Sequence, residues 1–263
     1  MSKIHNTAII AENVVLGENV EIGPYAIIED DVVIGDGTIV EAHAKICSGA
    51  RIGKGCRVSS FCVISGNPQD LHFDTSLKTY TEIGDGSVLR EGTTIHRATA
   101  EGKATVIGKN CLFMANTHAG HDCVIGDNVI VANYTAMGGH VHVGKDVFIS
   151  GGVMIHQRTR VGEGGIISGN SAASLDVPPY VIAFSRNELA GLNLIGMTRR
   201  GMPRAEIAEV KKLYASVYST LSARKNALSL LESGEAKTQA GLKFLEFFKL
   251  DGRRYMQPRG REQ

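Results

Sequence analysis

The sequence predicts a parallel β-helix followed by a small α-helical domain, and three observations lead to this prediction. A dipeptide of an aliphatic residue and glycine recurs at short, regular intervals. Glycine accounts for 31 of the 263 residues, nearly 12% against an average of roughly 7%. Past Gly201 the spacing of apolar residues changes from a strand pattern to a helical one. A short fixed period indicates coils that stack on one another.

The repeated dipeptide sets the size of the coil. It occurs at Leu16-Gly17, Ile22-Gly23, Ile34-Gly35, Ile52-Gly53, Ile83-Gly84, Ile107-Gly108, Ile125-Gly126, Val143-Gly144 and Val161-Gly162. All but one of the intervals are multiples of six, and the last three are 18 residues each. Six residues make one short strand with an inward aliphatic side chain, and three such units close a triangular coil. Coils stack at about 4.8 Å and bury their aliphatic faces only against their neighbours.

Two interruptions of the repeat predict loops. The repeats are expected from about Ile9 to about Asp176, and the off-period interval of 31 residues follows Ile52. This interval predicts a loop near residues 66–80. A stretch without inward aliphatic residues predicts a second loop at 98–103. Long loops of this kind are more often functional than decorative.

The repeats lead into a proline-rich segment, Asp176 to Tyr180. Because proline cannot donate to a strand ladder, this segment is expected to end the β-helix. Past Gly201 the helical pattern begins, and Pro203 suits a first helical residue. The predicted domains are therefore a β-helix at residues 1–190 and an α-helical domain at 191–263.

Composition indicates the cell compartment. The cysteines are odd in number and form no CxxC pair, which favours reduced thiols in a cytoplasmic protein; they are Cys47, Cys56, Cys62, Cys111 and Cys123. No apolar stretch is long enough to cross a membrane, and the first residues lack the apolar core of a signal peptide. A membrane span is therefore not expected.

Charge is distributed unevenly along the chain. The net charge is +1, but Arg199 to Gln263 hold 14 Lys or Arg against 7 Asp or Glu, which leaves the rest of the chain at −6. A basic C-terminal part suits an acidic partner, although a solvated helical surface has the same composition. A nucleic-acid partner is not expected.

Histidines are expected to converge at one corner of successive coils. Within the 18-residue coil, positions 12, 15, 16 and 14 hold His118, His121, His140 and His156. Asp122 and His140 are 18 residues apart and should stack at about one strand spacing. Clustered imidazoles can bind a metal, or one of them can act as a general base oriented by a carboxylate. The adjacent Gly138-Gly139 corner exposes backbone N–H groups that could stabilise an oxyanion.

Further motifs surround these histidines. They are Pro68–Leu71, Thr94–Arg97, Asn116–Cys123, Gly139–Val141, Ile155–Gln157, Asp176–Tyr180 and Arg199–Gly201. Together they resemble the UDP-N-acetylglucosamine O-acyltransferases, which catalyse the first step of lipid A biosynthesis. The resemblance covers essentially the whole chain. It implies a left-handed β-helix and a homotrimer whose active sites lie in clefts between neighbouring β-helices.

The resemblance also implies a reaction without a metal or cofactor. The donor would be a β-hydroxyacyl chain on the phosphopantetheine of acyl carrier protein, and the acceptor the glucosamine 3-position of UDP-GlcNAc. His121 would be the general base, Asp122 its orienting partner and the Gly139 N–H the oxyanion donor. Residues implied at the substrate sites are Gln69, Asp70, His72, His96, His118, His140, His156, Gln157, Gly169, Asn193, Arg199 and Arg200. Among these, Gly169 would help to set acyl chain length, and the two arginines would meet a phosphate.

The sequence departs from the usual pattern of that family at four places. His72 and Arg158 stand where Lys and Phe are usual, Arg186 lies in a segment that replaces a Gly-Asn pair, and Ile195 replaces an acidic residue. A neutral His72 would remove a cation that repels a protonated amine. A 3-amino UDP-sugar therefore remains an alternative acceptor, and the chain length is left open.

Other functions also remain open. One is another acyltransferase with the same repeats that uses coenzyme A or a different amino sugar. A second is a γ-type carbonic anhydrase, which is also a β-helical trimer and would hold zinc between subunits. A β-helical scaffold without activity does not account for the histidine corner or for the loop near Asp70.

Overall fold

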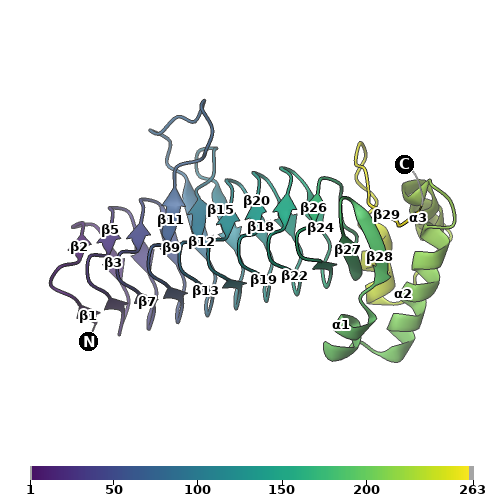
Figure 1. The fold of residues 1–263 in the computed structure, drawn as a ribbon, viewed down its shortest axis with the longest axis horizontal. Helices are drawn as coiled ribbons and strands as arrows, with labels where there is room; N and C mark the ends of the chain where they lie inside the picture. Colours follow the sequence, from purple (N-terminus) through teal and green to yellow (C-terminus); the bar gives the residue numbers. More distant parts are fainter. Residues whose placement is uncertain (1, 261–263) are drawn as a thin grey trace.

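The computed structural model describes residues 2–260 as a parallel β-helix that ends in a small helical domain (Figure 1). The chain starts at one end of the β-helix and finishes beside the helices at the other. Each coil contributes one short strand to each of the three sheets formed by the described residues, here called A, B and C. No helix in this part of the chain is long and apolar enough to cross a membrane.

Strands three apart in chain order are neighbours in each sheet, except at the end of sheet A, where β25, β27, β28 and β29 lie side by side in that order. Sheet A comprises β1 (Lys3–Ile4), β4 (Glu21–Ile22), β7 (Ile39–Val40), β10 (Arg57–Val58), β13 (Val88–Leu89), β16 (Leu112–Phe113), β19 (Ile130–Val131), β22 (Phe148–Ile149), β25 (Ile166–Ile167), β27 (Val181–Phe184), β28 (Glu188–Leu192) and β29 (Gln257–Pro258). Sheet B comprises β2 (Ile9–Ile10), β5 (Ile27–Ile28), β8 (Lys45–Ile46), β11 (Val63–Gly66), β14 (Thr94–His96), β17 (His118–Ala119), β20 (Ala136–Met137), β23 (Met154–Ile155) and β26 (Ala172–Ala173). Sheet C comprises β3 (Val15–Leu16), β6 (Val33–Ile34), β9 (Ala50–Ile52), β12 (Tyr80–Ile83), β15 (Ala104–Ile107), β18 (Val124–Ile125), β21 (His142–Val143) and β24 (Arg160–Val161).

The six-residue repeat determines which side chains form the core. In strands such as β5, β18 and β22 the second residue is buried and the first faces outward. Successive side chains of a strand point to opposite faces, so one aliphatic residue per strand fills the interior. The corners between strands use left-handed backbone, for example at Asp122 (φ +58°) and His140 (φ +59°).

Two loops leave the β-helix next to each other. One connects β11 to β12 at residues 67–79, and the other connects β14 to β15 at 97–103. They are hydrogen-bonded together, because the Lys78 N–H donates to a Glu101 carboxylate oxygen at 2.8 Å and the Gly102 N–H donates to the Lys78 carbonyl at 2.9 Å. Both project from the same side of the β-helix (Figure 1).

The strands of the β-helix extend at both ends beyond the range predicted for the repeats, Ile9 to Asp176. Strand β1 precedes Ile9, the predicted start. Val177, directly before the prolines, bridges to Val161, and past the prolines β27 continues sheet A beside β25. The prediction that the prolines end the β-helix was wrong for sheet A, because they lie at a corner where no ladder N–H is needed.

The C-terminal part is not purely helical. Its helices are α1 (Leu194–Arg199), α2 (Arg204–Val217), α3 (Ala223–Glu232) and α4 (Gln239–Glu246). Pro203 is the N-cap of α2 and so lies one residue before the predicted position. Strand β28 spans the predicted boundary between residues 190 and 191, and β29 returns to pair with it.

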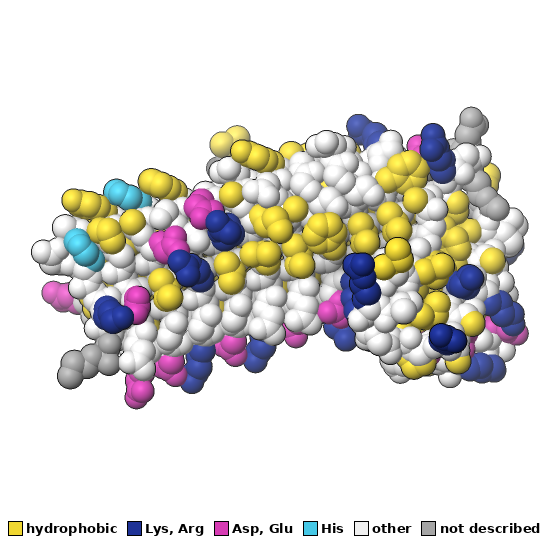
Figure 2. Space-filling view, turned by 60° about the horizontal axis from the view of Figure 1, so that its bottom comes forward, with side chains coloured by type: hydrophobic (Ala, Val, Ile, Leu, Met, Phe, Trp, Pro, Cys, Tyr) yellow, Lys and Arg dark blue, Asp and Glu magenta, His cyan; other side chains and the backbone are white. Residues whose placement is uncertain are grey.

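An apolar band covers the outer face of sheet A. Figure 2 shows hydrophobic side chains gathered along the length of the β-helix on the face that lies at the bottom in Figure 1, where the sheet A strands β7, β13, β19 and β22 are. The outward, partly exposed positions of these and neighbouring strands are Ile39, Val88, Leu112, Ile130, Phe148 and Ile166.

Candidate active site

His121 and Asp122 form a hydrogen-bonded pair at the corner between β17 and β18. The His121 Nδ1 lies 2.7 Å from the Asp122 Oδ2, and both side chains are mostly buried, with exposed fractions of 19% and 15%. The left-handed backbone at Asp122 lets consecutive side chains meet on the same side of the corner.

Further donors surround the Asp122 carboxylate. The Thr99 hydroxyl donates to Oδ2 at 2.7 Å, and the Thr99 N–H lies 3.2 and 3.3 Å from the two oxygens. Burial acts to raise the pKa of Asp122, but the hydrogen bonds from His121 and Thr99 outweigh burial and lower it. Because the ionised carboxylate only accepts hydrogen bonds, His121 Nδ1 donates to it, and the acceptor nitrogen of the neutral imidazole is then Nε2.

His140 stacks on this pair from the next coil, as the 18-residue spacing predicts. Its Nε2 lies 3.8 Å from the Asp122 Oδ2, and its ring meets the His121 ring edge to face at 5.1 Å. The backbone N–H of His140 donates to the His121 carbonyl at 2.9 Å. Burial lowers the pKa of His140, which favours a neutral ring.

Gly139 lies against the His121 ring. A Cβ at this position would be 2.5 Å from the His121 Cε1 and Nε2, so no side chain fits without moving the imidazole. The Gly139 N–H makes no hydrogen bond within residues 2–260. It is therefore available as a donor beside the Nε2 edge of the His121 ring.

His96 and His118 form a second pair beside the first. Their rings meet edge to face at 4.8 Å, and the Thr94 Oγ1 lies 2.8 Å from the His118 Nδ1. Burial, together with the neighbouring His118 and His121, lowers the pKa of His96 to about 4. Burial also lowers the pKa of His118. Both rings are therefore neutral near physiological pH.

A groove of about 580 Å³ runs from this corner along the outer face of sheet B. Its lining is Gln69, His96, His118, Gly120, His121, Ala136, Met137, Gly138, Gly139, Met154, Ile155, His156, Gln157, Ala172, Ala173, Ser174 and Arg186. The outward positions His118, Ala136, Met154 and Ala172 are in register on successive strands, and Ala172 bridges to Arg186. The groove is polar at the histidine end and mainly apolar beyond it.

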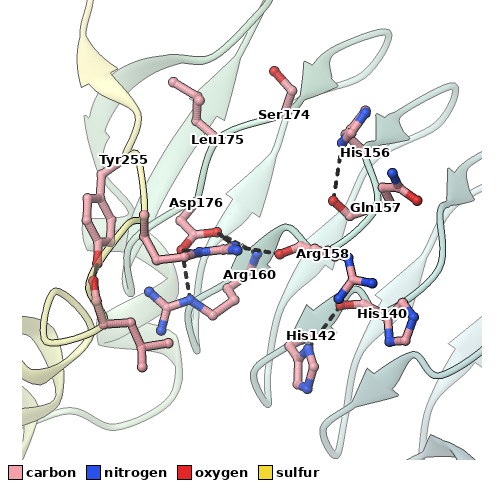
Figure 3. Close-up of polar contacts among 12 residues, drawn as sticks. His140, His142, His156, Gln157, Arg158, Arg160, Ser174, Leu175, Asp176 and Tyr255 are labelled. Atoms are coloured by element: carbon pink, nitrogen blue, oxygen red, sulfur yellow. Dashed lines mark hydrogen bonds and ion pairs between the residues drawn. The ribbon is translucent and has the colours of Figure 1, made fainter.

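The next coil brings further predicted residues to the groove. Figure 3 shows His156, Gln157 and Arg158 on the coil that follows His140, with Asp176 and Tyr255 beyond them toward the C-terminal part. The His156 Nδ1 lies 3.2 Å from the Gln157 carbonyl oxygen. Arg158 itself has left-handed backbone and an exposed side chain.

The structure separates other predicted residues from the groove. Asp70 and His72 lie in the exposed loop, where the His72 N–H donates to an Asp70 carboxylate oxygen at 2.9 Å. Gly169 is at the corner before β26, over Gly151, and is not part of the groove lining. Of the Gln69-Asp70 pair, only Gln69 reaches the groove within one chain.

Asn193, Arg199 and Arg200 lie away from the histidines, at the junction with the helical domain. The buried Asn193 side chain caps α1 and donates to the Gly164 carbonyl at 3.0 Å. The Arg200 guanidinium also donates to backbone carbonyls, those of Gly164 at 3.3 Å and of Asp146. A second cavity of about 250 Å³ is lined by Arg200 and not by Arg199. One chain therefore divides the predicted substrate residues between two places.

A metal could be held by His121, Asp122 and His140, whose ligand atoms all lie within 4.8 Å of one another. Such binding would have to replace the short His121–Asp122 hydrogen bond. The carboxylate is already the acceptor for Thr99 and His121. This arrangement fits an oriented base better than a metal ligand.

Two family profiles match the chain. The profile described as Udp N-acetylglucosamine O-acyltransferase; Domain 2 covers residues 176–256. The profile of the bacterial transferase hexapeptide (six repeats) covers residues 31–66 and 104–139.

Relatives named acyl-[acyl-carrier-protein]--UDP-N-acetylglucosamine O-acyltransferase cover most of the chain. The protein of Chlorobaculum tepidum is 47% identical over 188 residues, which is 71% of this chain and 71% of that protein. The protein of Rhizobium rhizogenes is 36% identical over 195 residues, 73% of this chain and 71% of that protein. The chain belongs to the UDP-N-acetylglucosamine O-acyltransferase family.

A solved structure of the same family agrees with the fold. The UDP-N-acetylglucosamine acyltransferase from Campylobacter jejuni matches with a TM-score of 0.90 and 33% identity, covering 97% of this chain and 99% of that one. The match confirms the predicted left-handed parallel β-helix with a small helical C-terminal domain.

The departures from the usual pattern of the UDP-N-acetylglucosamine O-acyltransferase family lie outside the His121–Asp122 pair. His72 and Ile195 are exposed, Ile195 to 68%. Arg186 lines the far end of the groove. Several site residues were not predicted from the sequence: Thr99, Ala136, Met154 and Ala172. The last three could have been found, because they share coil position 12 with His118.

Proposed function

We propose that the chain transfers a β-hydroxyacyl group from acyl carrier protein to the glucosamine 3-position of UDP-GlcNAc, with His121 as general base. One observation carries the proposal. His121 Nε2, the acceptor nitrogen of the neutral ring, lies against Gly139 at the polar end of the groove, and the Gly139 N–H makes no hydrogen bond within residues 2–260.

The reaction needs one proton carrier and one oxyanion donor. His121 Nε2 takes the proton of the sugar 3-hydroxyl as that oxygen attacks the thioester carbonyl carbon. The Gly139 N–H donates to the resulting oxyanion. When the tetrahedral intermediate collapses, the carbon–sulfur bond breaks and the thiolate of the pantetheine takes the proton from His121. Asp122 stabilises the imidazolium between the two steps.

The neighbouring side chains would bind the substrates. The neutral His118 offers hydrogen bonds without adding charge beside the base, and His140, His156 and Gln157 offer further hydrogen bonds. The column Ala136, Met154 and Ala172 would receive the acyl tail, because small and apolar side chains there leave room along the stacking direction. No metal or cofactor takes part in this scheme.

We propose two kinds of partner. One is further copies of this chain, which would form a homotrimer, and the other is acyl carrier protein. A homotrimer would cover the apolar band on sheet A, which is partly exposed to solvent in a single chain. It would also let Asn193, Arg199 or Asp70 of one copy approach the groove of another. The basic C-terminal part suits an acidic carrier protein. The cytoplasmic location stays a prediction.

The direct test is an assay of the purified protein with UDP-GlcNAc and β-hydroxyacyl carrier proteins of several chain lengths. We expect one acyl ester at the sugar 3-position, detected by mass and fragmentation, and no transfer from acyl coenzyme A. Transfer from coenzyme A alone would favour the other acyltransferases. Stoichiometric zinc together with CO₂ hydration, and no acyl transfer, would favour the carbonic anhydrase.

A second candidate keeps the reaction but changes the acceptor atom. His72 replaces a usual lysine and is exposed in the loop that also brings Gln69 to the groove. A neutral imidazole tolerates an amine better than a permanent cation does. Competition between UDP-GlcNAc and its 3-amino analogue decides between them: the amine candidate fails if the analogue gains only a trace of acyl group while UDP-GlcNAc turns over normally.

A further inference from the structure

Thr99 makes contacts that set it apart from the other residues of its loop. Both its hydroxyl and its N–H point at the Asp122 carboxylate, with the hydroxyl at 2.7 Å from Oδ2 and the N–H at 3.2 Å from the same oxygen. Thr99 follows β14, 23 residues before Asp122, at the start of the short loop that interrupts the repeat. The loop thus brings a hydroxyl to a corner that the coils alone would leave open.

The loop keeps its shape through bonds that do not involve the Thr99 side chain. The Ala98 N–H donates to the Tyr80 carbonyl at 3.2 Å, and the Lys103 N–H donates to the Ala100 carbonyl at 3.0 Å. The Tyr80 N–H in turn donates to the Lys103 carbonyl at 2.9 Å. These backbone bonds remain when the side chain of residue 99 is changed.

The hydroxyl restricts how the carboxylate can turn. Oδ2 accepts from Thr99 on one side and from His121 Nδ1 on the other. The Asp122 N–H is held separately by the Thr105 hydroxyl oxygen at 2.8 Å. With backbone and side chain both fixed, the carboxylate presents one lone pair toward the imidazole, and only the Nδ1-protonated tautomer of His121 satisfies it.

We propose that Thr99 is a positioning residue, whose hydroxyl fixes the Asp122 carboxylate and through it the tautomer and direction of the His121 ring. The inference rests on the proposed role of His121 as general base. Thr99 acts through Asp122 and does not touch the reacting atoms.

Thr99→Val, Thr99→Ser and the control Thr75→Val test this role. Valine keeps the shape of threonine without the hydroxyl, serine keeps the hydroxyl, and Thr75 is an exposed residue of the neighbouring loop. We expect Thr99→Val to lower kcat by about 10- to 100-fold, the size of one lost hydrogen bond to a charged group. KM for both substrates should change little. Thr99→Ser and Thr75→Val should stay near wild type.

The pH profile separates positioning from a structural role. Loss of a donor raises the pKa of the Asp122 carboxyl, so the acid limb of kcat should move to higher pH in Thr99→Val and return in Thr99→Ser. The inference is overturned if Thr99→Val keeps wild-type kcat, if serine does not rescue, or if activity falls only in step with lost thermal stability. Should valine not fold, Thr99→Ala against Thr99→Ser gives the same comparison. His121→Ala, assayed in parallel, shows separately whether the proposed base fails.

Discussion

His121 is the residue on which the proposed chemistry depends most directly. It is a corner residue whose ring contacts Asp122, His140 and Gly139 and fills no part of the buried core. His121→Ala should therefore leave the fold intact and lower kcat by about 10²–10⁴-fold, the usual contribution of a general base. Steady-state assays with circular dichroism as the folding control check this. Retention of more than about a tenth of wild-type kcat would refute the assignment.

His96 gives a prediction about pH and stability. Burial lowers its pKa from 6.5 to about 4 in the folded chain. The unfolded chain therefore binds a proton between these values that the folded chain does not, so the free energy of unfolding should fall as pH drops from about 6.5 to about 4. The free energy of unfolding, measured by chemical denaturation at each pH in this range, should depend less on pH in His96→Gln than in wild type.

An exposed histidine provides the control for that measurement. His5→Gln, at the start of the β-helix, should leave the pH dependence of the free energy of unfolding unchanged, because the side chain is exposed. If the free energy of unfolding falls equally with pH in wild type and in His96→Gln, the prediction is wrong. The loss of stability in acid then comes from other groups.

Strands and corners are the scale at which the sequence was most informative. A constant 18-residue period makes spatial neighbours computable, and Asp122 with His140 stack as that period requires. The loops break the period, so the contact of Thr99 with Asp122 across 23 residues could not be read from spacing. The Arg200 side chain donates to backbone carbonyls at the junction with α1. Its direction could not be predicted, because this junction lies outside the repeats.

The choice of column for the acyl tail shows a second limit of the period. Spacing alone identifies residues that stack but not which stack borders a cavity. The family resemblance implies a role in chain length for Gly169, which stacks over Gly151 at the corner before β26. The groove seen in one chain borders the sheet B column three residues further along each coil, which includes Met154 and Ala172.

Met154 predicts a change in acyl chain preference. It is 53% exposed and stands between Ala136 and Ala172 in the groove column. Removal of its side chain in Met154→Ala should open about one strand spacing, about 4.8 Å, and so favour acyl chains longer by about two to four carbons. The measurement is kcat/KM across a series of acyl carrier proteins, with Val124→Ala on sheet C as the control.

The same assay tests the corner column. If Gly169 borders the tail, as the family resemblance implies, Gly169→Met should shorten the preferred chain by several carbons. An unchanged preference in Met154→Ala would remove the sheet B column from the tail site, and an unchanged preference in Gly169→Met would remove the corner column.

At the scale of the whole molecule, one buried carboxylate joins the C-terminal part to the β-helix. Asp176 is 1% exposed and pairs with Arg160, at 2.7 Å, and with Arg253. Arg253 also donates to the Arg158 carbonyl, on the coil that carries His156 (Figure 3). A buried charge is tolerated only when it is paired and hydrogen-bonded. The helical domain is thereby held in one position relative to the far end of the groove.

The apolar band on sheet A leads to a prediction about assembly. Five outward apolar residues, from Val88 to Ile166, are in register on successive strands, and Arg57 separates them from Ile39. A contiguous apolar patch of this kind marks an interaction site. If copies of the chain pack through this face, Phe148→Glu should place a charge in the interface, dissociate the assembly and abolish most activity. Val124→Glu puts the same charge on the outer face of sheet C, where Val124 is 40% exposed, and should do neither.

Light scattering after size-exclusion chromatography gives the mass, with a trimer expected for wild type and monomer for Phe148→Glu. A monomeric, active wild type would contradict the assembly, and dissociation by Val124→Glu alone would assign the interface to sheet C.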